Sequence, residues 1–186
     1  SPDKDVAVGW RSPMNGQVKI EGRVADADNK CGNGAAWTLE LLSGGGVEVL
    51  ASGVFDNGRD ESFKLKEPIA VGKGDFVSLV MGPRDRNHTC DTTHVEIILT
   101  DAVPEGRTWK LSDDVIDDIH AGNPHPDKHG NPDTWHFYVR AAPKKKTSHS
   151  LPNGSSIARW KKAMQDEAVP EELDELALAV TAVISA

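Results

Sequence analysis

Between residues 6 and 100 the chain consists of short runs in which apolar and polar residues alternate, separated by turn residues. The clearest run, 17–24, places Val18, Ile20 and Val24 on one side and mainly charged residues on the other. A period of two is typical of a strand with one buried and one solvated face. Further runs at 35–42, 47–55 and 62–65 are bounded by Gly-, Asn- or Pro-containing turns. The pattern predicts an antiparallel β-sandwich or jelly roll of six or seven short strands.

Two more β-branched runs, 71–80 and 95–99, flank a polar loop at 84–93 that carries Cys90. Loops supported by a rigid β scaffold commonly hold binding residues. The side chains at the end of this loop, Asp91, Thr92 and Thr93, are therefore predicted to contact a ligand.

The only two cysteines, Cys31 and Cys90, each lie in a polar loop between predicted strands. Free cysteine prefers burial, so two cysteines in loops favour a Cys31–Cys90 disulfide and an extracytoplasmic location, whether periplasmic, secreted or at the cell surface. The alternative is two unrelated thiols. No C-x-x-C-H motif is present, so the segment does not carry covalent haem.

If the disulfide forms, loop 25–34 lies beside loop 84–93. Asp26, Asp28, Asn33 and Asp91 would then bring together the oxygen ligands that Ca²⁺ prefers. The ordinary alternative is turn chemistry, since Asp, Asn and Gly favour turns in any case.

A second polar segment, 120–136, is dense in histidine and aspartate. His125 and His129, with Asp127 between them, have the side-chain chemistry of a transition-metal site, which would make the chain a small metal-dependent enzyme. The spacing matches no known ligand motif, and prolines at 124, 126 and 132 favour a structural loop. No nucleophile motif such as G-x-S-x-G is present. We therefore expect a non-catalytic module, with the activity of any parent protein left open.

Five tryptophans are available for packing or for ligand stacking. A tryptophan within a strand usually belongs to the core, which we expect for Trp37, whereas an exposed indole can stack on a sugar ring. Trp10, Trp109 and Trp135 lie near segment ends and are predicted to bind ligand. A structural spacer without a ligand would instead bury all three and show no groove.

Acidic residues outnumber basic ones by 29 to 21, for a net charge of −8. This balance argues against a nucleic-acid partner and against binding to an anionic membrane, since both require clustered Lys and Arg. No apolar run approaches the roughly 20 residues that span a bilayer. The polar start without methionine leads us to expect a piece of a longer chain.

The composition divides the chain into three parts. Residues 1–140 are expected to form the β-sandwich module, closed by a strand near 135–139, and residues 141–154 a linker. Residues 155–186 have the pattern of two amphipathic helices, packing on the sandwich or on a neighbouring domain of the parent chain. Their apolar residues recur at helical spacing: Ile157, Trp160, Met164, Leu173, Leu176, Val180 and Ile184.

Several ordered motifs carry a family resemblance. They are G-W-R-S-P-M-N-G-Q-V at 9–18, C-G-N-G-A-A-W at 31–37, V-G-K-G-D at 71–75 and H-T-C-D-T-T at 88–93, followed by similar stretches at 122–127 and 135–138. Over residues 8–140 the chain resembles a β-sandwich module of large planctomycete-type secreted proteins that also carry cytochrome-like domains and domains of unknown function. More loosely, W-x-S-P-x-x-G and V-x-x-G-D resemble jelly-roll carbohydrate-binding modules.

The resemblance implies a sugar site on loops or on a concave face, and a structural Ca²⁺. The haem chemistry of the parent proteins does not carry over, because no haem motif falls in this chain. The resemblance and the residue patterns together lead us to expect a non-catalytic module that binds a polysaccharide or glycan. A structural spacer and a small metal-dependent enzyme are the alternatives.

Overall fold

A computed structural model describes residues 4–87, 89–90 and 92–141. The chain divides into two compact units, 1–142 and 143–186, of which the first contains all the described residues. The two helices predicted within 155–186, and the predicted linker from residue 142 onward, lie outside the described residues. No described helix is long and apolar enough to cross a membrane.

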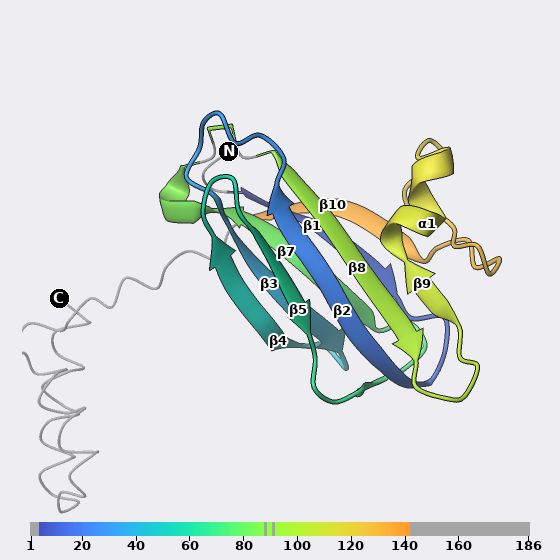
Figure 1. Cartoon of the computed structure of the whole chain (residues 1–186). Helices are drawn as coiled ribbons and strands as arrows, with labels where there is room; N and C mark the ends of the chain where they lie inside the picture. The colour runs from blue at the N-terminus through green and yellow to red at the C-terminus, as the bar shows by residue number, and fades with distance from the viewer. Residues whose placement is uncertain (1–3, 88, 91, 142–186) are drawn as a thin grey trace, which may run out of the picture. The chain divides into compact units, whose positions relative to one another are not determined.

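The described unit is mostly β and contains two antiparallel sheets (Figure 1). The first sheet has the strand order β10-β1-β7-β3-β4. Its strands are β1 (Lys4–Arg11), β3 (Ala35–Ser43), β4 (Gly46–Phe55), β7 (Phe76–Pro83) and β10 (Trp135–Ala141). The first and last described strands are therefore neighbours, and a β-bulge between Leu39 and Glu40 shifts the register of β3 against β4.

The second sheet has the order β5-β2-β8-β9, and a short strand, β6, also pairs with β2. Its strands are β2 (Gly16–Asp26), β5 (Asp60–Lys64), β6 (Ile69–Val71), β8 (Thr93–Asp101) and β9 (Thr108–Lys110). The prediction of consecutive short antiparallel strands is confirmed.

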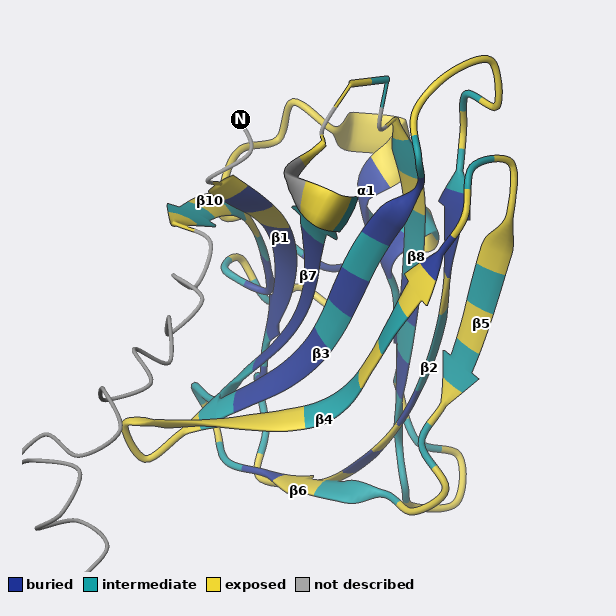
Figure 2. Ribbon diagram, turned by 90° about the vertical axis from the view of Figure 1, so that its left-hand side faces the viewer, coloured by how far each residue is buried: buried dark blue, intermediate teal, exposed yellow. Residues whose placement is uncertain are grey.

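The two sheets share one hydrophobic core, to which alternate residues of each strand contribute. Trp10, Leu39 and Leu79 enter it from the first sheet, and Ile20 and Leu99 enter it from the second. Figure 2 shows the buried positions concentrated on β1, β3 and β7, while the edge strands β4 and β5 are largely exposed or half-buried. The period-two pattern in the sequence therefore corresponds to the inner face of each sheet.

The segment between β9 and β10 contains helix α1 (Leu111–Val115) and a 3-10 turn, η2 (Ile116–Asp118). Leu111 and Val115 are buried in the shared core. The rest of the segment returns to β10 through a bridge in which His125 and Trp135 exchange both backbone hydrogen bonds, at 2.7 and 2.9 Å. This segment, of which 120–136 was predicted to be a loop, thus adds a short helix to the core. A second 3-10 turn, η1 (Arg84–Arg86), follows β7.

Candidate functional site

The predicted disulfide is present: Cys31 is bonded to Cys90, with a Cα–Cα distance of 5.6 Å. It joins two loops 59 residues apart in the sequence. We call the described residues of 26–34, 56–59 and 84–93 the disulfide rim. A bond within one chain favours an oxidising, extracytoplasmic environment.

The two aspartates of the rim that were predicted to bind Ca²⁺ cap backbone turns. Asp26 accepts hydrogen bonds from the backbone N–H of Asp28 at 2.9 Å and of Gly58 at 2.7 Å. Asp28 accepts one from the backbone N–H of Lys30 at 3.2 Å. Within the described residues no group of three or more His, Cys, Asp or Glu side chains is arranged to hold a metal ion. Asp91, the fourth predicted ligand, lies outside the described residues.

Arg84 connects the three loops of the rim. Its guanidinium donates to the carbonyl of Asn33 at 3.3 Å and pairs with Asp56, whose hydrogen bond raises the pKa of Arg84 above its ordinary value. The Asn33 amide donates in return to the carbonyl of Arg84 at 3.1 Å. The rim also brings the two predicted threonines to one end of the second sheet. The carbonyl of Thr92 accepts a hydrogen bond from the backbone N–H of Ala27. Thr93, at the start of β8, pairs with Asp26 of β2.

The three tryptophans that were predicted to stack on a ligand lie in the core instead. Trp10, Trp109 and Trp135 each have an exposed fraction of 0%. The rings of Trp10 and Trp109 meet edge to face, with centroids 5.1 Å apart. The prediction is wrong in the described fold, because an indole without exposed surface cannot stack on a sugar. Their position near the ends of strands had suggested exposure, but α1 and the segment after it cover that end of the core.

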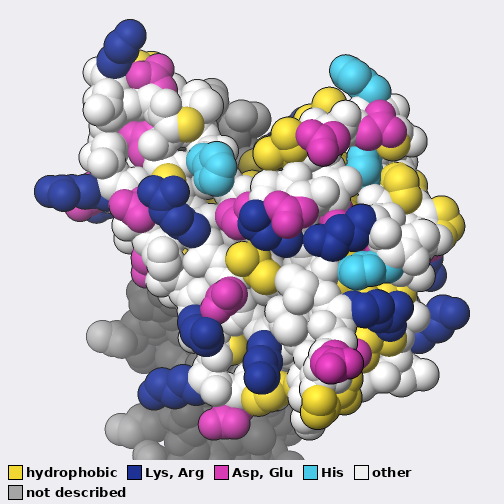
Figure 3. All heavy atoms as spheres, turned by 45° about the vertical axis from the view of Figure 1, so that its right-hand side comes forward, with side chains coloured by type: hydrophobic (Ala, Val, Ile, Leu, Met, Phe, Trp, Pro, Cys, Tyr) yellow, Lys and Arg dark blue, Asp and Glu magenta, His cyan; other side chains and the backbone are white. Residues whose placement is uncertain are grey.

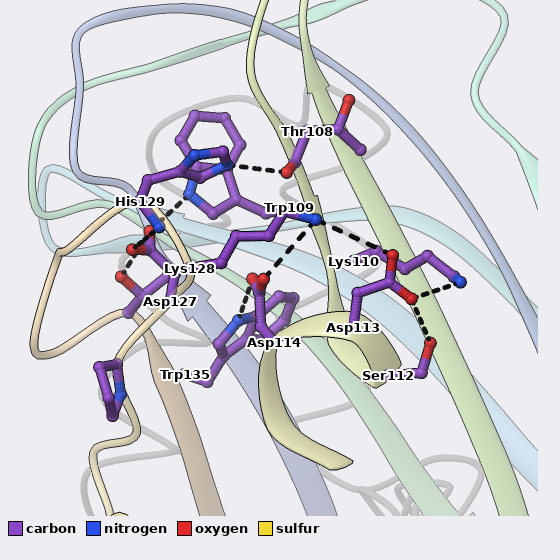
Figure 4. Close-up of polar contacts among 12 residues, drawn as sticks. Thr108, Trp109, Lys110, Ser112, Asp113, Asp114, Asp127, Lys128, His129 and Trp135 are labelled. Atoms are coloured by element: carbon purple, nitrogen blue, oxygen red, sulfur yellow. Dashed lines mark hydrogen bonds and ion pairs between the residues drawn. The ribbon is translucent and has the colours of Figure 1, made fainter. Parts of the chain in front are cut away.

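A buried carboxylate, Asp127, fixes one of these indoles. It accepts hydrogen bonds from Trp109 Nε1 at 2.7 Å, from the side chain and backbone of Asn131 at 2.7 and 2.8 Å, and from the backbone of His129 at 2.9 Å (Figure 4). Thr134 adds a hydroxyl donor at 3.2 Å. Burial raises the pKa of Asp127, but these hydrogen bonds lower it more, so the pKa lies below its ordinary value.

A second carboxylate, Asp114 of α1, fixes another indole by accepting a hydrogen bond from Trp135 Nε1 at 2.9 Å (Figure 4). Its other oxygen, Oδ1, accepts no hydrogen bond among the described residues but lies 3.9 Å from Lys128 Nζ. Burial is the largest influence and raises the pKa of Asp114 above its ordinary value, since fewer donors oppose it than at Asp127. The two aspartates are therefore structural anchors for the core tryptophans.

The histidines predicted to ligate a transition metal are engaged in the same structure. His125 is buried, and its ring nitrogens lie 2.7 Å from the carbonyl oxygens of Pro126 and Asp118. His129 Nε2 lies 2.9 Å from the carbonyl of Thr108, and its ring meets Trp109 edge to face. With Asp127 also saturated, the three side chains of this prediction do not form a metal site in the described fold.

Figure 3 views the molecule from the side of α1 and β9, where acidic, basic and histidine side chains alternate with small hydrophobic areas. This surface combines the ion pair of Lys110 with Asp113, at 2.6 Å, and the looser pair of Lys128 with Asp113, at 3.8 Å. We interpret it as the solvated side of the structural segment.

A different group of polar side chains lies on the outer face of the first sheet. Because the inner positions of β10, β1, β7 and β3 enter the core, the alternate positions of these strands share the opposite face. We call this group the polar face; it consists of Asp5, Glu40, Ser78, His136, Tyr138 and Arg140. His136 belongs to the histidine-rich segment 120–136, but none of these six residues was named as a ligand or a ligand contact in the sequence analysis.

The polar face is organised around Arg140. Its guanidinium donates two hydrogen bonds to the carboxylate of Glu40, at 2.7 and 2.9 Å, in the bidentate geometry of a strong pair. Its Nε lies 3.6 Å from the carboxylate of Asp5. Hydrogen bonding to Glu40 raises the pKa of Arg140 above its ordinary value. One cation thus serves two buried carboxylates across four adjacent strands.

Tyr138 lies beside this pair and crosses the strand between β10 and β7. Its hydroxyl donates to Ser78 Oγ at 2.8 Å. Tyr138 can cross β1 only where that strand has no side chain, at Gly9. A Cβ at Gly9 would lie 3.3 Å from atoms of Phe76, Ser78 and Tyr138. His136 packs edge to face on Phe76, with centroids 4.8 Å apart.

The arrangement of the polar face can recognise a polar, uncharged ligand. The imidazole of His136, the hydroxyl of Tyr138 and the guanidinium of Arg140 lie at half-buried positions of the sheet, next to the half-buried ring of Phe76. The carboxylates of Asp5 and Glu40 and the hydroxyl of Ser78 are themselves buried, so they hold these groups in place rather than contact the ligand. The signal in the sequence is the alternation of His136, Tyr138 and Arg140, but which strands neighbour β10 is not readable from it.

Comparison with protein-family models, with curated proteins and with solved structures finds no match to this chain, so the site is defined by its own geometry.

Proposed function

We propose that this chain is a non-catalytic carbohydrate-binding module with a jelly-roll type of β-sandwich, part of a larger extracytoplasmic protein. The observation that carries the proposal is the polar face, where His136, Tyr138 and Arg140 lie at half-buried positions of β10, and the buried Glu40 and Ser78 hold Arg140 and Tyr138 in place. The resemblance of residues 8–140 to modules of planctomycete-type secreted proteins supports it, as does the disulfide.

The ligand that fits this face best is a neutral polysaccharide. The chain carries a net charge of −8, and the described carboxylates of the polar face outnumber its guanidinium, so an anionic polysaccharide would be repelled. Sugar hydroxyls can accept from Arg140 and exchange hydrogen bonds with the imidazole of His136 and the hydroxyl of Tyr138, whose ring offers an aromatic edge. A Ca²⁺ ion bound by Asp26, Asp28, Asn33 and Asp91 remains part of the proposal, as an ion that stabilises the rim.

Affinity electrophoresis through gels containing single neutral polysaccharides tests the proposal. The wild-type chain should be retarded in at least one gel, and His136→Ala should remove most of the retardation. His120→Ala, a histidine exposed in the turn after η2, is the matched control and should migrate as the wild type does. Retardation by none of the neutral polysaccharides would contradict the proposal, as would equal effects of the two variants.

The same gels compare the polar face with the disulfide rim. Thr92→Ala removes one of the hydroxyls originally predicted to bind ligand, without touching the polar face. If Thr92→Ala abolishes retardation and His136→Ala does not, the glycan binds at the rim and the proposed location is wrong.

A structural spacer is the second candidate, and one observation favours it: Trp10, Trp109 and Trp135 are all buried, as that hypothesis predicts. Its other requirement, a surface without a groove, does not agree with the cavity described below. The metal-dependent enzyme is not proposed further, because His125, His129 and Asp127 use their polar atoms within the fold.

A further inference from the structure

A cavity of about 430 Å³ opens between the two sheets on the inner side of β10. Its volume lies within the range of roughly 300–1,000 Å³ that is usual for small-molecule sites. We call it the apolar slot. One wall is formed by β1, β7 and β10 of the first sheet, and the other by the start of β8 in the second sheet.

The strand register explains the shape of the slot. Val139 pairs with Val6, which pairs with Met81, and the next inward row runs from Phe137 through Val8 to Leu79. These two rows of apolar side chains face Thr93 and Val95 of β8. The slot is therefore an extension of the hydrophobic core toward the edge of the sheets.

The slot remains open because the second sheet is shorter at this edge. β9 pairs only with Ile98–Thr100 of β8, and the chain then turns into α1, whose Leu111 and Val115 fill the core further along. Beyond that point the apolar side chains are left exposed, with fractions of 55% at Val6, 37% at Phe137 and 59% at Val139. In a closed sandwich one layer of apolar side chains would cover them.

Two observations limit what can occupy the slot. Stacked sheets lie about 10 Å apart, which leaves room for a single layer of apolar groups and not for a helix of roughly 10–12 Å diameter. An added strand is disfavoured at Phe137, because Asn123 already bonds both its backbone groups, at 2.7 and 3.0 Å. A thin, flexible chain without backbone amides satisfies both limits.

The side chains that line the slot further restrict the chemical class of its ligand. Among the described residues no charged side chain lines the slot, and the polar residues that line it are Thr93 and Tyr138, of which Tyr138 directs its hydroxyl to Ser78 on the polar face. None of the described residues that line the slot would neutralise a carboxylate or an ammonium group, and the net charge of −8 disfavours anions. We propose that the apolar slot binds an uncharged, unbranched aliphatic chain, with a hydroxyl or ester head at Thr93.

Isothermal titration calorimetry with decanol tests this inference on the whole chain. Val139→Glu places a carboxylate in the slot and should weaken binding about tenfold or more, since a charge cannot be buried there without a partner. Val49→Glu is the matched control: it also replaces a valine exposed by 59%, on the opposite edge strand of the same sheet. Its decanol affinity should stay within about twofold of the wild type, as for most exposed changes.

A second variant, Val95→Trp, fills the slot from β8 without adding charge, and it should also reduce decanol binding. Sedimentation velocity on the same samples tests a second copy of the chain as the occupant. The inference is overturned if the folded wild type does not bind decanol, or if Val49→Glu reduces binding as much as Val139→Glu. It is also overturned if the wild type associates and Val139→Glu makes it monomeric. Glycan retardation does not enter these readouts, so the slot and the polar face succeed or fail separately.

Discussion

Strand β10 contributes to two surfaces of opposite character. His136, Tyr138 and Arg140 lie on the polar face, whereas Phe137 and Val139, between them in sequence, line the apolar slot. The polar side is held by specific hydrogen bonds and by the ion pairs of Arg140 with Glu40 and Asp5, and the apolar side is held by packing. The difference teaches that in a two-sheet fold a single edge strand can contribute to two surfaces of different chemistry, because each face is reached by every second residue.

The largest expected loss of stability comes from a change that disturbs both the polar face and the apolar slot. Asp127→Ala removes the acceptor of Trp109 and of Thr134, the residue before β10. Each buried donor left without a partner costs roughly 1–3 kcal/mol, so the free energy of unfolding should fall by about 4 kcal/mol. Urea denaturation measures it. Asp117→Ala, at an exposed aspartate in η2, should change it by less than about 0.5 kcal/mol.

The next largest loss of stability is expected from a change that affects the polar face and leaves the apolar slot intact. Arg140→Met leaves the carboxylates of Glu40 and Asp5 without their cation. Breaking a buried pair costs roughly 3–5 kcal/mol, and the one-third exposure of Arg140 places the expected loss at about 3 kcal/mol. Decanol binding should persist in the folded variant. Adding Glu40→Gln should restore part of the lost stability in urea denaturation; no recovery would contradict the role assigned to the pair.

The pH dependence of stability tests Asp127, which anchors Trp109 and the residue before β10. The pKa of Asp127 is lower in the folded state than the ordinary value of about 3.9, so its contribution is present above pH 4 and is lost as the pH falls through its folded pKa. The pKa of Asp114 is raised in the folded state, so its contribution to stability increases as the pH falls. In Asp127→Asn the unfolding free energy should fall less steeply with acid, by up to about 1.4 kcal/mol per pH unit. An unchanged acid profile in urea titrations between pH 2 and 5 would contradict this assignment.

A smaller effect is expected for the hydroxyl of the polar face. Tyr138→Phe keeps the ring over Gly9 but removes the hydrogen bond to Ser78. The expected loss is about 1 kcal/mol of stability, together with weaker glycan retardation and unchanged decanol affinity. Thermal unfolding and the two binding assays measure these quantities. A loss of decanol affinity would show that the faces are coupled.

The smallest change in stability is expected in the slot. Val139→Glu and Val49→Glu both alter half-exposed valines on edge strands and should each change the unfolding free energy by less than about 0.5 kcal/mol. Only the decanol affinity should distinguish them. A much larger destabilisation by Val139→Glu in urea would mean that the slot is closed in solution.

The sequence predicted the strands well, because alternation at 17–24 and 35–42 directly reflects one buried face. It also predicted the disulfide from two cysteines in polar loops. It misplaced Trp10, Trp109 and Trp135, since the covering by α1 depends on a short helix with no clear periodicity. The polar face and the slot were missed because both depend on β10 pairing with β1, and on β1 pairing with β7, across long sequence separations.

The pairing of Lys4 with Ala141 means that the described chain enters and leaves this unit at adjacent points of one ladder. A force that separates those two points would open the β1–β10 ladder one residue pair at a time rather than shear it as a whole. The first pairs to part would be those that hold Arg140 and Val139, so mechanical tension would disable both surfaces before the tryptophan core yields.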